Sequence, residues 1–135
     1  MILGVGIDLC EIGRMARAIE KEHFLERVFT PSEAQRIRGA SQTRRGQIAA
    51  GLFAAKEAVA KALGTGFSGF GPDCVEVMPD GAGRPECLLK AGALDRATRL
   101  AGGPVRVWVS ITHEAGMAGA VAVLEAEDGG RRDAP

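Results

Sequence analysis

The stretch at residues 48–66, IAAGLFAAKEAVAKALGTG, constrains the fold of this chain more than any other part of the sequence. It predicts a helix with one apolar face at helical spacing, formed by Ile48, Leu52, Ala55, Val59, Ala62 and Leu63. The opposite face is also apolar, with Ala50, Phe53 and Ala54, except for Glu57 and Lys61. Gly64 and Gly66 end the helix. A helix that is apolar all round is buried, so this one carries a carboxylate and an ammonium into burial.

Three interpretations of Glu57 and Lys61 are open. An i,i+4 Glu–Lys pair on an exposed helix face stabilises it by roughly 0.2–0.5 kcal/mol. On a buried face, desolvation costs several kcal/mol per ion, which such a pair does not return. The alternatives are therefore a metal or phosphate site, or a subunit interface. Spacing alone does not decide among them.

Length and composition describe one ordinary soluble domain. The 135 residues are 46% hydrophobic and 25% charged. Lys and Arg number 17, as do Asp and Glu, so net charge gives no case for general nucleic-acid affinity. The first third is nevertheless basic, which leaves room for a local patch that binds an acidic partner. Its basic residues include Arg14, Arg17, Lys21, Arg27, Arg36, Arg38, Arg44 and Arg45.

The cysteines and the N-terminus predict a cytoplasmic protein. Cys10, Cys74 and Cys87 are odd in number and far apart, which is typical of reduced thiols and not of a disulfide framework or a zinc site. The first residues, MILGVGIDL, lack a basic segment and reach an acid at Asp8. We therefore expect neither a signal peptide nor a membrane span there.

The remaining pattern predicts an α+β fold, a single domain whose mainly antiparallel sheet packs against the long central helix. Strands are expected at 2–9, 74–78, 84–90, 105–111 and 117–124, and further helices at 11–22, 31–38 and 93–101. Thr30 and Glu33 form a capping box at the start of the second of these helices. The domain is expected to cover 1–125, with a flexible polar tail at 126–135.

Four separated residues are compatible with a magnesium–phosphate site. Asp8 lies near the end of the first strand, with only Gly4 and Gly6 on its face. Magnesium takes one or two protein carboxylates and completes its shell with substrate phosphates and water, which suits Asp8 and Glu57. Lys61 and His113 are then candidate phosphate contacts. Singly, each of these residues has a structural role more often than a functional one.

Two motifs in this order resemble the paired signature of the 4′-phosphopantetheinyl transferases. They are VGID at 5–8 and FAAKEAVAKA at 53–62. Glu11, Arg14, the LGTG at 63–66, the GRP at 83–85 and the SITH at 110–113 extend the likeness toward the short, stand-alone holo-acyl-carrier-protein synthase type. The resemblance runs from residue 2 to about 124.

This resemblance implies an enzyme that transfers 4′-phosphopantetheine from coenzyme A to a serine of apo-acyl carrier protein, in support of fatty acid biosynthesis. The other product is adenosine 3′,5′-bisphosphate. Asp8 and Glu57 match the family's magnesium ligands, and Glu57 and Lys61 match its catalytic residues. The base that takes the serine proton is either Glu57 or a metal-bound water.

Further positions are implied in the same way. The coenzyme A contacts would be Lys61, Gly64, Gly83, Arg84, Pro85, His113 and Arg45, and the carrier protein would dock on Arg14, Lys21, Phe24 and Arg27. The short type forms homotrimers with active sites at subunit interfaces, and a homotrimer is expected here. No nucleic-acid or membrane partner is expected.

One departure from the family pattern concerns coenzyme A. Leu52 stands where the family commonly has an arginine that helps hold this substrate, and Arg44 or Arg45 is the available replacement. Gln47 also replaces an acid that is often found there. Two alternatives therefore stay open: a non-catalytic module that binds carrier protein or coenzyme A, and a purely structural oligomer. Intact Asp8, Glu57 and Lys61 argue against the binding module, and a structural oligomer would show no metal-dependent ligand binding.

Overall fold

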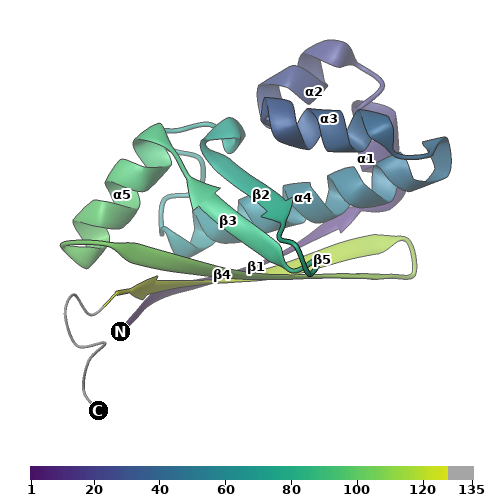
Figure 1. Cartoon of the computed structure of the whole chain (residues 1–135). Helices are drawn as coiled ribbons and strands as arrows, with labels where there is room; N and C mark the ends of the chain where they lie inside the picture. The colour runs from purple at the N-terminus through teal and green to yellow at the C-terminus, as the bar shows by residue number, and fades with distance from the viewer. Residues whose placement is uncertain (128–135) are drawn as a thin grey trace.

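A three-stranded antiparallel sheet in the order β1–β5–β4 forms one layer of the molecule (Figure 1). The computed structural model describes residues 1–127, and the expected tail therefore lies outside the described residues from 128 onward. The strands are β1 (Ile2–Glu11), β4 (Val105–Glu114) and β5 (Met117–Ala126). The start of β1 and the end of β5 lie side by side, and there the Ala126 amide donates to the Met1 carbonyl over 2.9 Å.

A tight hairpin sets the register of β4 and β5. Ala115 and Gly116 both have positive φ, at 52° and 77°, as two-residue hairpin turns require. The register then pairs Glu114 with Met117 and runs without a shift to Val105 opposite Ala126. The predicted alternation of β4 follows, because Val107 and Ile111 face the protein interior more than Arg106 and Trp108 do.

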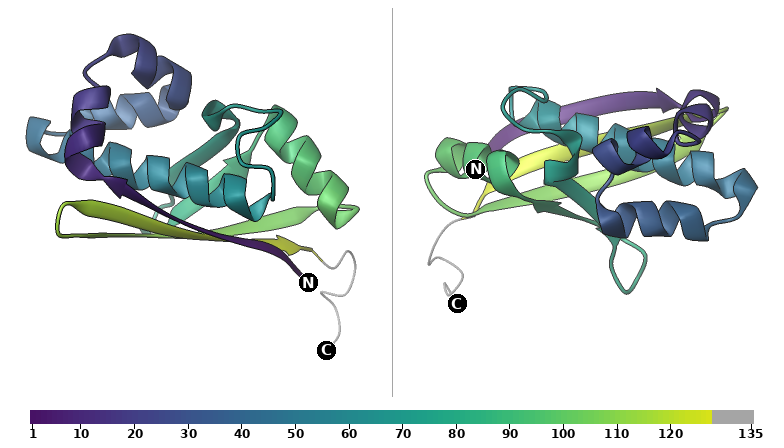
Figure 2. Two further views of the ribbon diagram at one scale, coloured as in Figure 1. Left: turned by 180° about the vertical axis from the view of Figure 1, so that it is seen from behind. Right: turned by 90° about the horizontal axis from the view of Figure 1, so that it is seen from above.

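Helix α4 (Gln42–Ala62) lies along one face of this sheet and contacts all three strands (Figure 2). It is buried on nearly every side, which confirms the prediction from its all-round apolar sequence. The β1 backbone comes close to it at Gly4 and Gly6, where a Cβ would lie 1.9 and 1.8 Å from the carbonyl oxygens of Ala62 and Ala58. The two glycines are therefore what allows β1 and α4 to pack together.

Three short helices, α1 (Ile12–Ala18), α2 (Glu22–Val28) and α3 (Pro31–Gly39), gather at the N-terminal end of α4. The single helix predicted at 11–22 is wrong. Glu11 stays in β1 because the next amide, that of Ile12, bonds the Gly116 carbonyl over 2.9 Å. The chain then turns after α1 so that α2 buries Leu25 and Val28 in the core. The capping box of Thr30 and Glu33 forms as predicted.

The second half of the chain adds a separate two-stranded sheet. A 3₁₀ turn, η1 (Pro72–Cys74), leads into β2 (Val75–Pro79), which pairs with β3 (Pro85–Leu89) as the predicted hairpin. Asp80 holds the connecting turn, since its Oδ1 accepts from the amides of Ala82 and Arg84 over 2.8 and 2.9 Å. Helix α5 (Ala91–Ala101) follows. The α+β prediction is confirmed, and no helix within residues 1–127 is long and apolar enough to cross a membrane.

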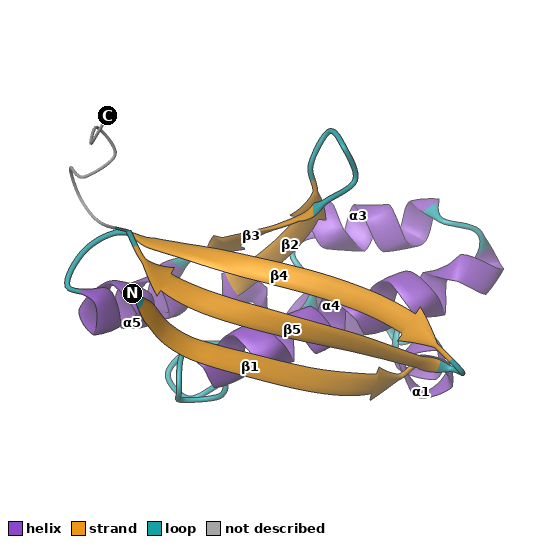
Figure 3. Cartoon of the chain, turned by 90° about the horizontal axis from the view of Figure 1, so that it is seen from below, coloured by secondary structure: helices purple, strands orange, loops and turns teal. Residues whose placement is uncertain are grey.

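The other face of the three-stranded sheet carries no helix (Figure 3). On β1 it presents Val5, Ile7 and Leu9, whose exposed fractions are 61%, 68% and 67%. Val121 on β5 and Trp108 on β4 extend this apolar surface across the sheet. We call these five residues the open sheet face.

Candidate active site

Asp8, Glu57 and Lys61 lie together where β1 crosses the C-terminal half of α4. The alternation of β1 turns Asp8 toward the helix, in line with Gly4 and Gly6. The Lys61 ammonium donates to Asp8 Oδ1 and to the Ile7 carbonyl, both over 3.0 Å. Within residues 1–127, Lys61 forms its ion pair with Asp8 and so joins helix α4 to strand β1. The i,i+4 ion pair with Glu57 is not formed among these described residues.

Glu57 is half-buried beside these groups, and its environment disfavours its charge. Burial raises the pKa of the Glu57 carboxyl, the negative charge of Asp8 raises it further, and the Lys61 ammonium partly opposes them. The Cys10 thiol, two residues beyond Asp8, also has a raised pKa, mainly from burial and then from Asp8. The two pKa shifts share the same two largest causes, which are burial and the negative charge of Asp8.

These two carboxylates fit a hard divalent cation. A cation between Asp8 and Glu57 would offset the repulsion that raises the pKa of Glu57. Within residues 1–127 no group of three or more His, Cys, Asp or Glu side chains is placed to hold a metal. A magnesium ion here would take two protein ligands and fill its remaining positions from substrate oxygens and water, as this metal ordinarily does.

A second group of residues lines a cleft of about 210 Å³ between the first half of α4 and the β2–β3 hairpin. Among them are Arg36, Arg44, Leu52, Gly83, Pro85 and His113. The ring of His113 comes from the far end of β4, and its Nε2 lies 3.1 Å from the Gln47 carbonyl oxygen. Gly51 makes room for this ring, since a Cβ there would lie 2.9 Å from Nε2.

The cleft thus collects three of the predicted coenzyme A residues, Gly83, Pro85 and His113. Arg36 joins them from the last turn of α3, and sequence reasoning misses it because nothing distinguishes it from the other basic residues of that region. Its neighbour in the cleft, Arg44, is one of the two candidates to replace the arginine missing at Leu52.

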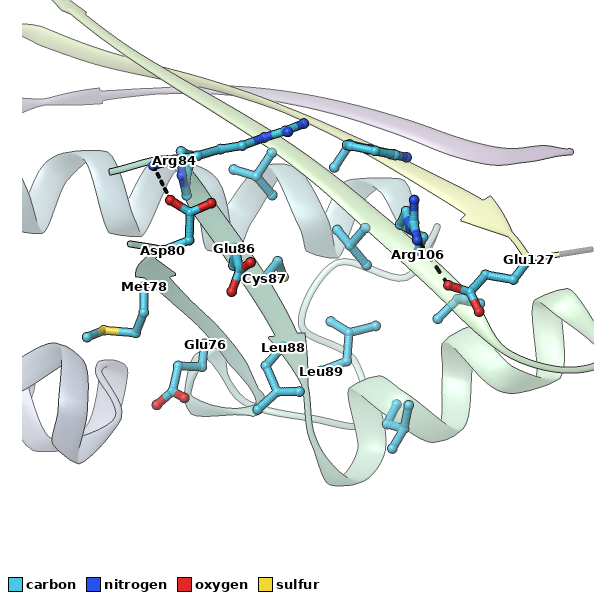
Figure 4. Close-up of a pocket in the computed structure, with 16 residues that line it drawn as sticks. Glu76, Met78, Asp80, Arg84, Glu86, Cys87, Leu88, Leu89, Arg106 and Glu127 are labelled. Carbon is cyan, nitrogen blue, oxygen red and sulfur yellow. Dashed lines mark hydrogen bonds and ion pairs between the residues drawn. The ribbon is translucent and has the colours of Figure 1, made fainter. Parts of the chain in front are cut away.

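The remaining predicted coenzyme A residues lie elsewhere. Arg45 points to the end of α3, where its Nη2 and Nε donate to the carbonyls of Arg38 and Ala40 over 2.8 and 3.1 Å. Gly64 follows α4 with a φ of +83°. Arg84 lines a different and larger cleft of about 770 Å³ between β3 and β4, where its guanidinium lies 5.2 Å from the Trp108 ring (Figure 4).

The carboxylate pair and the cleft beside the β2–β3 hairpin lie on opposite flanks of α4. Asp8 is on β1 and His113 is on β4, the two outer strands of the sheet. The central strand β5 separates them, and α4 packs over it. One chain therefore holds both groups on the α4 side of the sheet, but on different sides of the helix.

The residues predicted to dock a carrier protein are at the surface of α1 and α2. Arg14, Lys21 and Arg27 are exposed, and Phe24 is partly buried against the core. Arg14 comes from α1, Lys21 from the turn at 19–21, and Phe24 and Arg27 from α2, so Arg14 and Lys21 do not share the helix predicted for them.

Comparison with known proteins identifies the family. The sequence model of the 4′-phosphopantetheinyl transferase superfamily matches residues 4–112. The chain belongs to this superfamily. The matched range includes Asp8, Glu57 and Lys61, and the predicted resemblance is confirmed.

Several similar proteins are holo-[acyl-carrier-protein] synthases, and this chain spans nearly the whole of each. The holo-[acyl-carrier-protein] synthase of Clostridium acetobutylicum is 43% identical over 126 residues, which cover 93% of this chain and 98% of that protein. That of Solidesulfovibrio magneticus is 45% identical over 128 residues, covering 93% and 99%. The crystal structure of the Bacillus anthracis holo-(acyl-carrier-protein) synthase in complex with CoA (3′,5′-ADP) has a TM-score of 0.78 at 33% identity, and covers 94% of this chain and 99% of its own.

Proposed function

We propose that this chain is a holo-[acyl-carrier-protein] synthase, which transfers the 4′-phosphopantetheine group of coenzyme A to a serine of apo-acyl carrier protein. The observation that carries the proposal is the grouping of Asp8, Glu57 and Lys61 between β1 and α4 in a member of this superfamily. The second product is adenosine 3′,5′-bisphosphate, and the reaction supports fatty acid biosynthesis.

The proposed chemistry uses three side chains in distinct roles. The serine hydroxyl attacks the pantetheine-side phosphorus of the pyrophosphate, and the bond from this phosphorus to the adenosine-side oxygen breaks. Magnesium, held by Asp8 and Glu57, would neutralise charge on the pyrophosphate. The Lys61 ammonium, fixed against β1 by Asp8 and the Ile7 carbonyl, is placed to stabilise the departing phosphate. Asp8 is paired with Lys61, so Glu57 is the carboxylate of this group assigned to take the serine proton.

We place the nucleotide end of coenzyme A in the cleft beside the β2–β3 hairpin. Arg44 and Arg36 supply positive charge there for a phosphate, and His113 supplies a ring nitrogen. Leu52 is 2% exposed and contributes an apolar wall. We assign to Arg44 the substrate-holding role of the family's usual arginine, because Arg45 is already engaged with α3 carbonyls.

We propose a homotrimer whose active sites lie between subunits. The open sheet face gives each chain an uncovered apolar surface, of the kind that marks protein–protein interfaces. The separation of the carboxylates from the cleft by α4 supports the same assembly, because a neighbouring chain can bring its cleft to the carboxylates of the first. The carrier protein would then dock on Arg14, Lys21, Phe24 and Arg27. The three free cysteines support a cytoplasmic location.

The deciding experiment is a transfer assay. Apo-acyl carrier protein is incubated with coenzyme A, magnesium and this chain, and mass spectrometry is expected to show the gain of one phosphopantetheine group. Glu57→Gln is the inactive control, and the matched variant Glu26→Gln, on the exposed surface of α2, is expected to keep activity. Binding of coenzyme A without transfer would favour the non-catalytic module instead, and no binding at all would favour a structural oligomer.

A further inference from the structure

Glu33 and Lys56 form a fully buried ion pair that the proposed chemistry does not use. Lys56 Nζ lies 2.6 Å from Glu33 Oε1, and both side chains have exposed fractions of 0%. Lys56 immediately precedes Glu57 in α4, and Glu33 lies in the first turn of α3. Burying two charges in this way adds little stability compared with an apolar pair of the same shape. Stability alone therefore does not explain why these two charges are buried here.

Both side chains bond to backbone groups as well as to each other. Lys56 donates to the carbonyls of Val75 and Pro72 over 2.5 and 3.0 Å. Glu33 Oε2 accepts from the Val77 amide over 2.8 Å, and its Oε1 accepts from the Thr30 amide over 2.9 Å. The pair thus binds β2 from two sides, through a carbonyl at Val75 and an amide at Val77.

The β2–β3 hairpin depends on these bonds because it belongs to no larger sheet. Among the described residues the backbone ladder of these two strands joins only β2 to β3, and β3 lies beside β4 without joining its ladder. Within residues 1–127, the hairpin has one further polar contact with the α3 region, which is the hydrogen bond from the Thr30 hydroxyl to Glu76. Lys56 and Glu33 are therefore the link from the hairpin to α4 itself.

The hairpin and α4 are the two walls of the proposed nucleotide cleft. Val77, Met78 and Pro79 of β2 line one wall, and Gly51 and Leu52 of α4 line the other. Val77 is itself a partner of the buried pair, so the bond that holds the hairpin is also a bond at the wall of the cleft.

We propose that Glu33 and Lys56 are positioning residues for coenzyme A: they hold the β2–β3 wall at a fixed distance from α4 and so set the width of the nucleotide cleft. The proposal rests on the proposed function of this cleft. The geometry of the pair adds a requirement of polarity. Lys56 faces two carbonyls and Glu33 faces two amides, so the two charges are not interchangeable.

The test measures the steady-state kinetics of a set of variants, with coenzyme A and apo-acyl carrier protein titrated separately. In Glu33→Leu/Lys56→Met the two carbonyls and two amides lose their side-chain partners while apolar volume is kept. We expect KM for coenzyme A to rise about tenfold or more, with KM for apo-carrier protein unchanged and kcat within about threefold. The swapped pair Glu33→Lys/Lys56→Glu restores an ion pair but reverses its polarity, and is expected to be as impaired.

A destabilised control separates positioning from stability. Leu124→Ala opens a hole under β5, and is expected to lower the melting temperature while leaving KM for coenzyme A unchanged. Two results would overturn the proposal: wild-type KM for coenzyme A in the apolar double variant, or recovery of KM in the swapped pair. If neither double variant folds, Glu33→Gln, which keeps one acceptor oxygen, is expected to give an intermediate rise in KM, and an unchanged KM refutes the proposal.

A second measurement keeps this inference distinct from the catalytic assignment. Calorimetry reports the dissociation constant of coenzyme A whether or not transfer occurs. If the wild-type chain binds coenzyme A but transfers nothing, the proposed function fails, and the positioning role is still tested by the dissociation constants of the same variants. Hydrogen exchange at the Val77 amide is expected to accelerate in the apolar double variant, while the β4–β5 ladder stays protected.

Discussion

Gly6 faces the carbonyl oxygen of Ala58 so closely that a Cβ added to the glycine would lie 1.8 Å from that oxygen. No side-chain adjustment relieves this contact, because the atom it meets is helix backbone. Asp8, two residues along the same face of β1, meets Lys61 one turn along α4. The close approach at Gly6 therefore fixes the depth at which Asp8 reaches the site.

Gly6→Ala is expected to destabilise the fold by about 1–3 kcal/mol, because β1 must move away from α4 to accept the methyl group. Urea unfolding measures the loss, and the transfer assay is expected to show reduced kcat through displacement of Asp8. Gly39→Ala is the matched control, since a Cβ at Gly39 meets nothing within 4 Å and the substitution is expected to leave both quantities near wild type. Equal behaviour of the two variants would contradict this account.

The sequence predicts the parts of this fold that follow from periodicity and turn chemistry. The all-round apolar helix, the alternating strand β4 and the capping box at Thr30 are all confirmed. The late start of α1 and its break from α2 are not predicted, because the first depends on a long-range bond from Ile12 to Gly116 and the second on the burial of Leu25. No local pattern carries such tertiary information.

The candidate site also contains residues that the sequence predicts and residues that it does not. The paired motif groups Asp8, Glu57 and Lys61, and the structure brings them together. The sequence assigns no role to Lys56, because its partner Glu33 is in a different helix and is marked in the sequence only as a capping residue. Which of Arg44 and Arg45 enters the cleft depends on the rotation of α4, which the sequence does not define to within one residue.

Glu57→Gln is expected to stabilise the metal-free protein at neutral pH while abolishing transfer. Burial and Asp8 raise the pKa of Glu57 in the folded state above its ordinary value of 4.5. Between these two pKa values the folded state binds more protons than the unfolded state, so the stability contributed by Glu57 falls as pH rises through that window. Above it the ionised side chain is destabilising, and glutamine removes the cost.

Thermal melts without magnesium, from about pH 3.5 to about pH 8, measure this effect. The variant is expected to melt higher than wild type at pH 7, and the difference is expected to disappear at the acid end, where Glu57 is protonated in both states. Added magnesium is expected to raise the melting temperature of wild type and not of the variant. A variant that melts lower than wild type at pH 7 would show that burial and the Asp8 charge do not make ionised Glu57 destabilising.

Arg44→Ala and Arg45→Ala are expected to separate substrate binding from stability. Arg44 lines the cleft, so its removal is expected to raise KM for coenzyme A about tenfold, because a charge-assisted bond to the substrate is no longer made. Arg45 donates to two carbonyls at the end of α3, so its removal is expected to lower stability by about 1 kcal/mol with KM unchanged. Steady-state kinetics and urea unfolding of both variants measure KM and stability. A raised KM in Arg45→Ala with an unchanged KM in Arg44→Ala would assign the substrate-holding role to Arg45.

The Cys87 thiol is expected to resist alkylation in the folded protein. Burial raises its pKa to about 12, with the Lys56 ammonium opposing the shift, so almost no thiolate is present at pH 8. Iodoacetamide followed by peptide mass mapping is expected to label Cys87 only after unfolding in urea. Rapid labelling of the folded chain at pH 8 would show that the Cys87 thiol, which is partly exposed at the cleft between β3 and β4, ionises more readily than this pKa implies.

Ile7→Glu is expected to dissociate the proposed trimer and, with it, to abolish the activity. Ile7 is 68% exposed on the open sheet face and lies opposite Val121 of β5. A charge placed there would be buried without a partner in any assembly that covers this face, which costs several kcal/mol. Analytical ultracentrifugation is expected to give a trimer for wild type and a monomer for the variant. The monomer is expected to melt cooperatively, because the substitution leaves the α4 side of the sheet untouched.

The control for this variant is Leu100→Glu, on the exposed surface of α5, which is expected to stay trimeric and active. It introduces the same charge in place of an exposed apolar side chain, but away from the open sheet face. Dissociation of both variants would mean that added negative charge, and not its position, breaks the assembly. An active monomer of Ile7→Glu would show that one chain completes the site alone, in spite of the separation of Asp8 from His113 across β5.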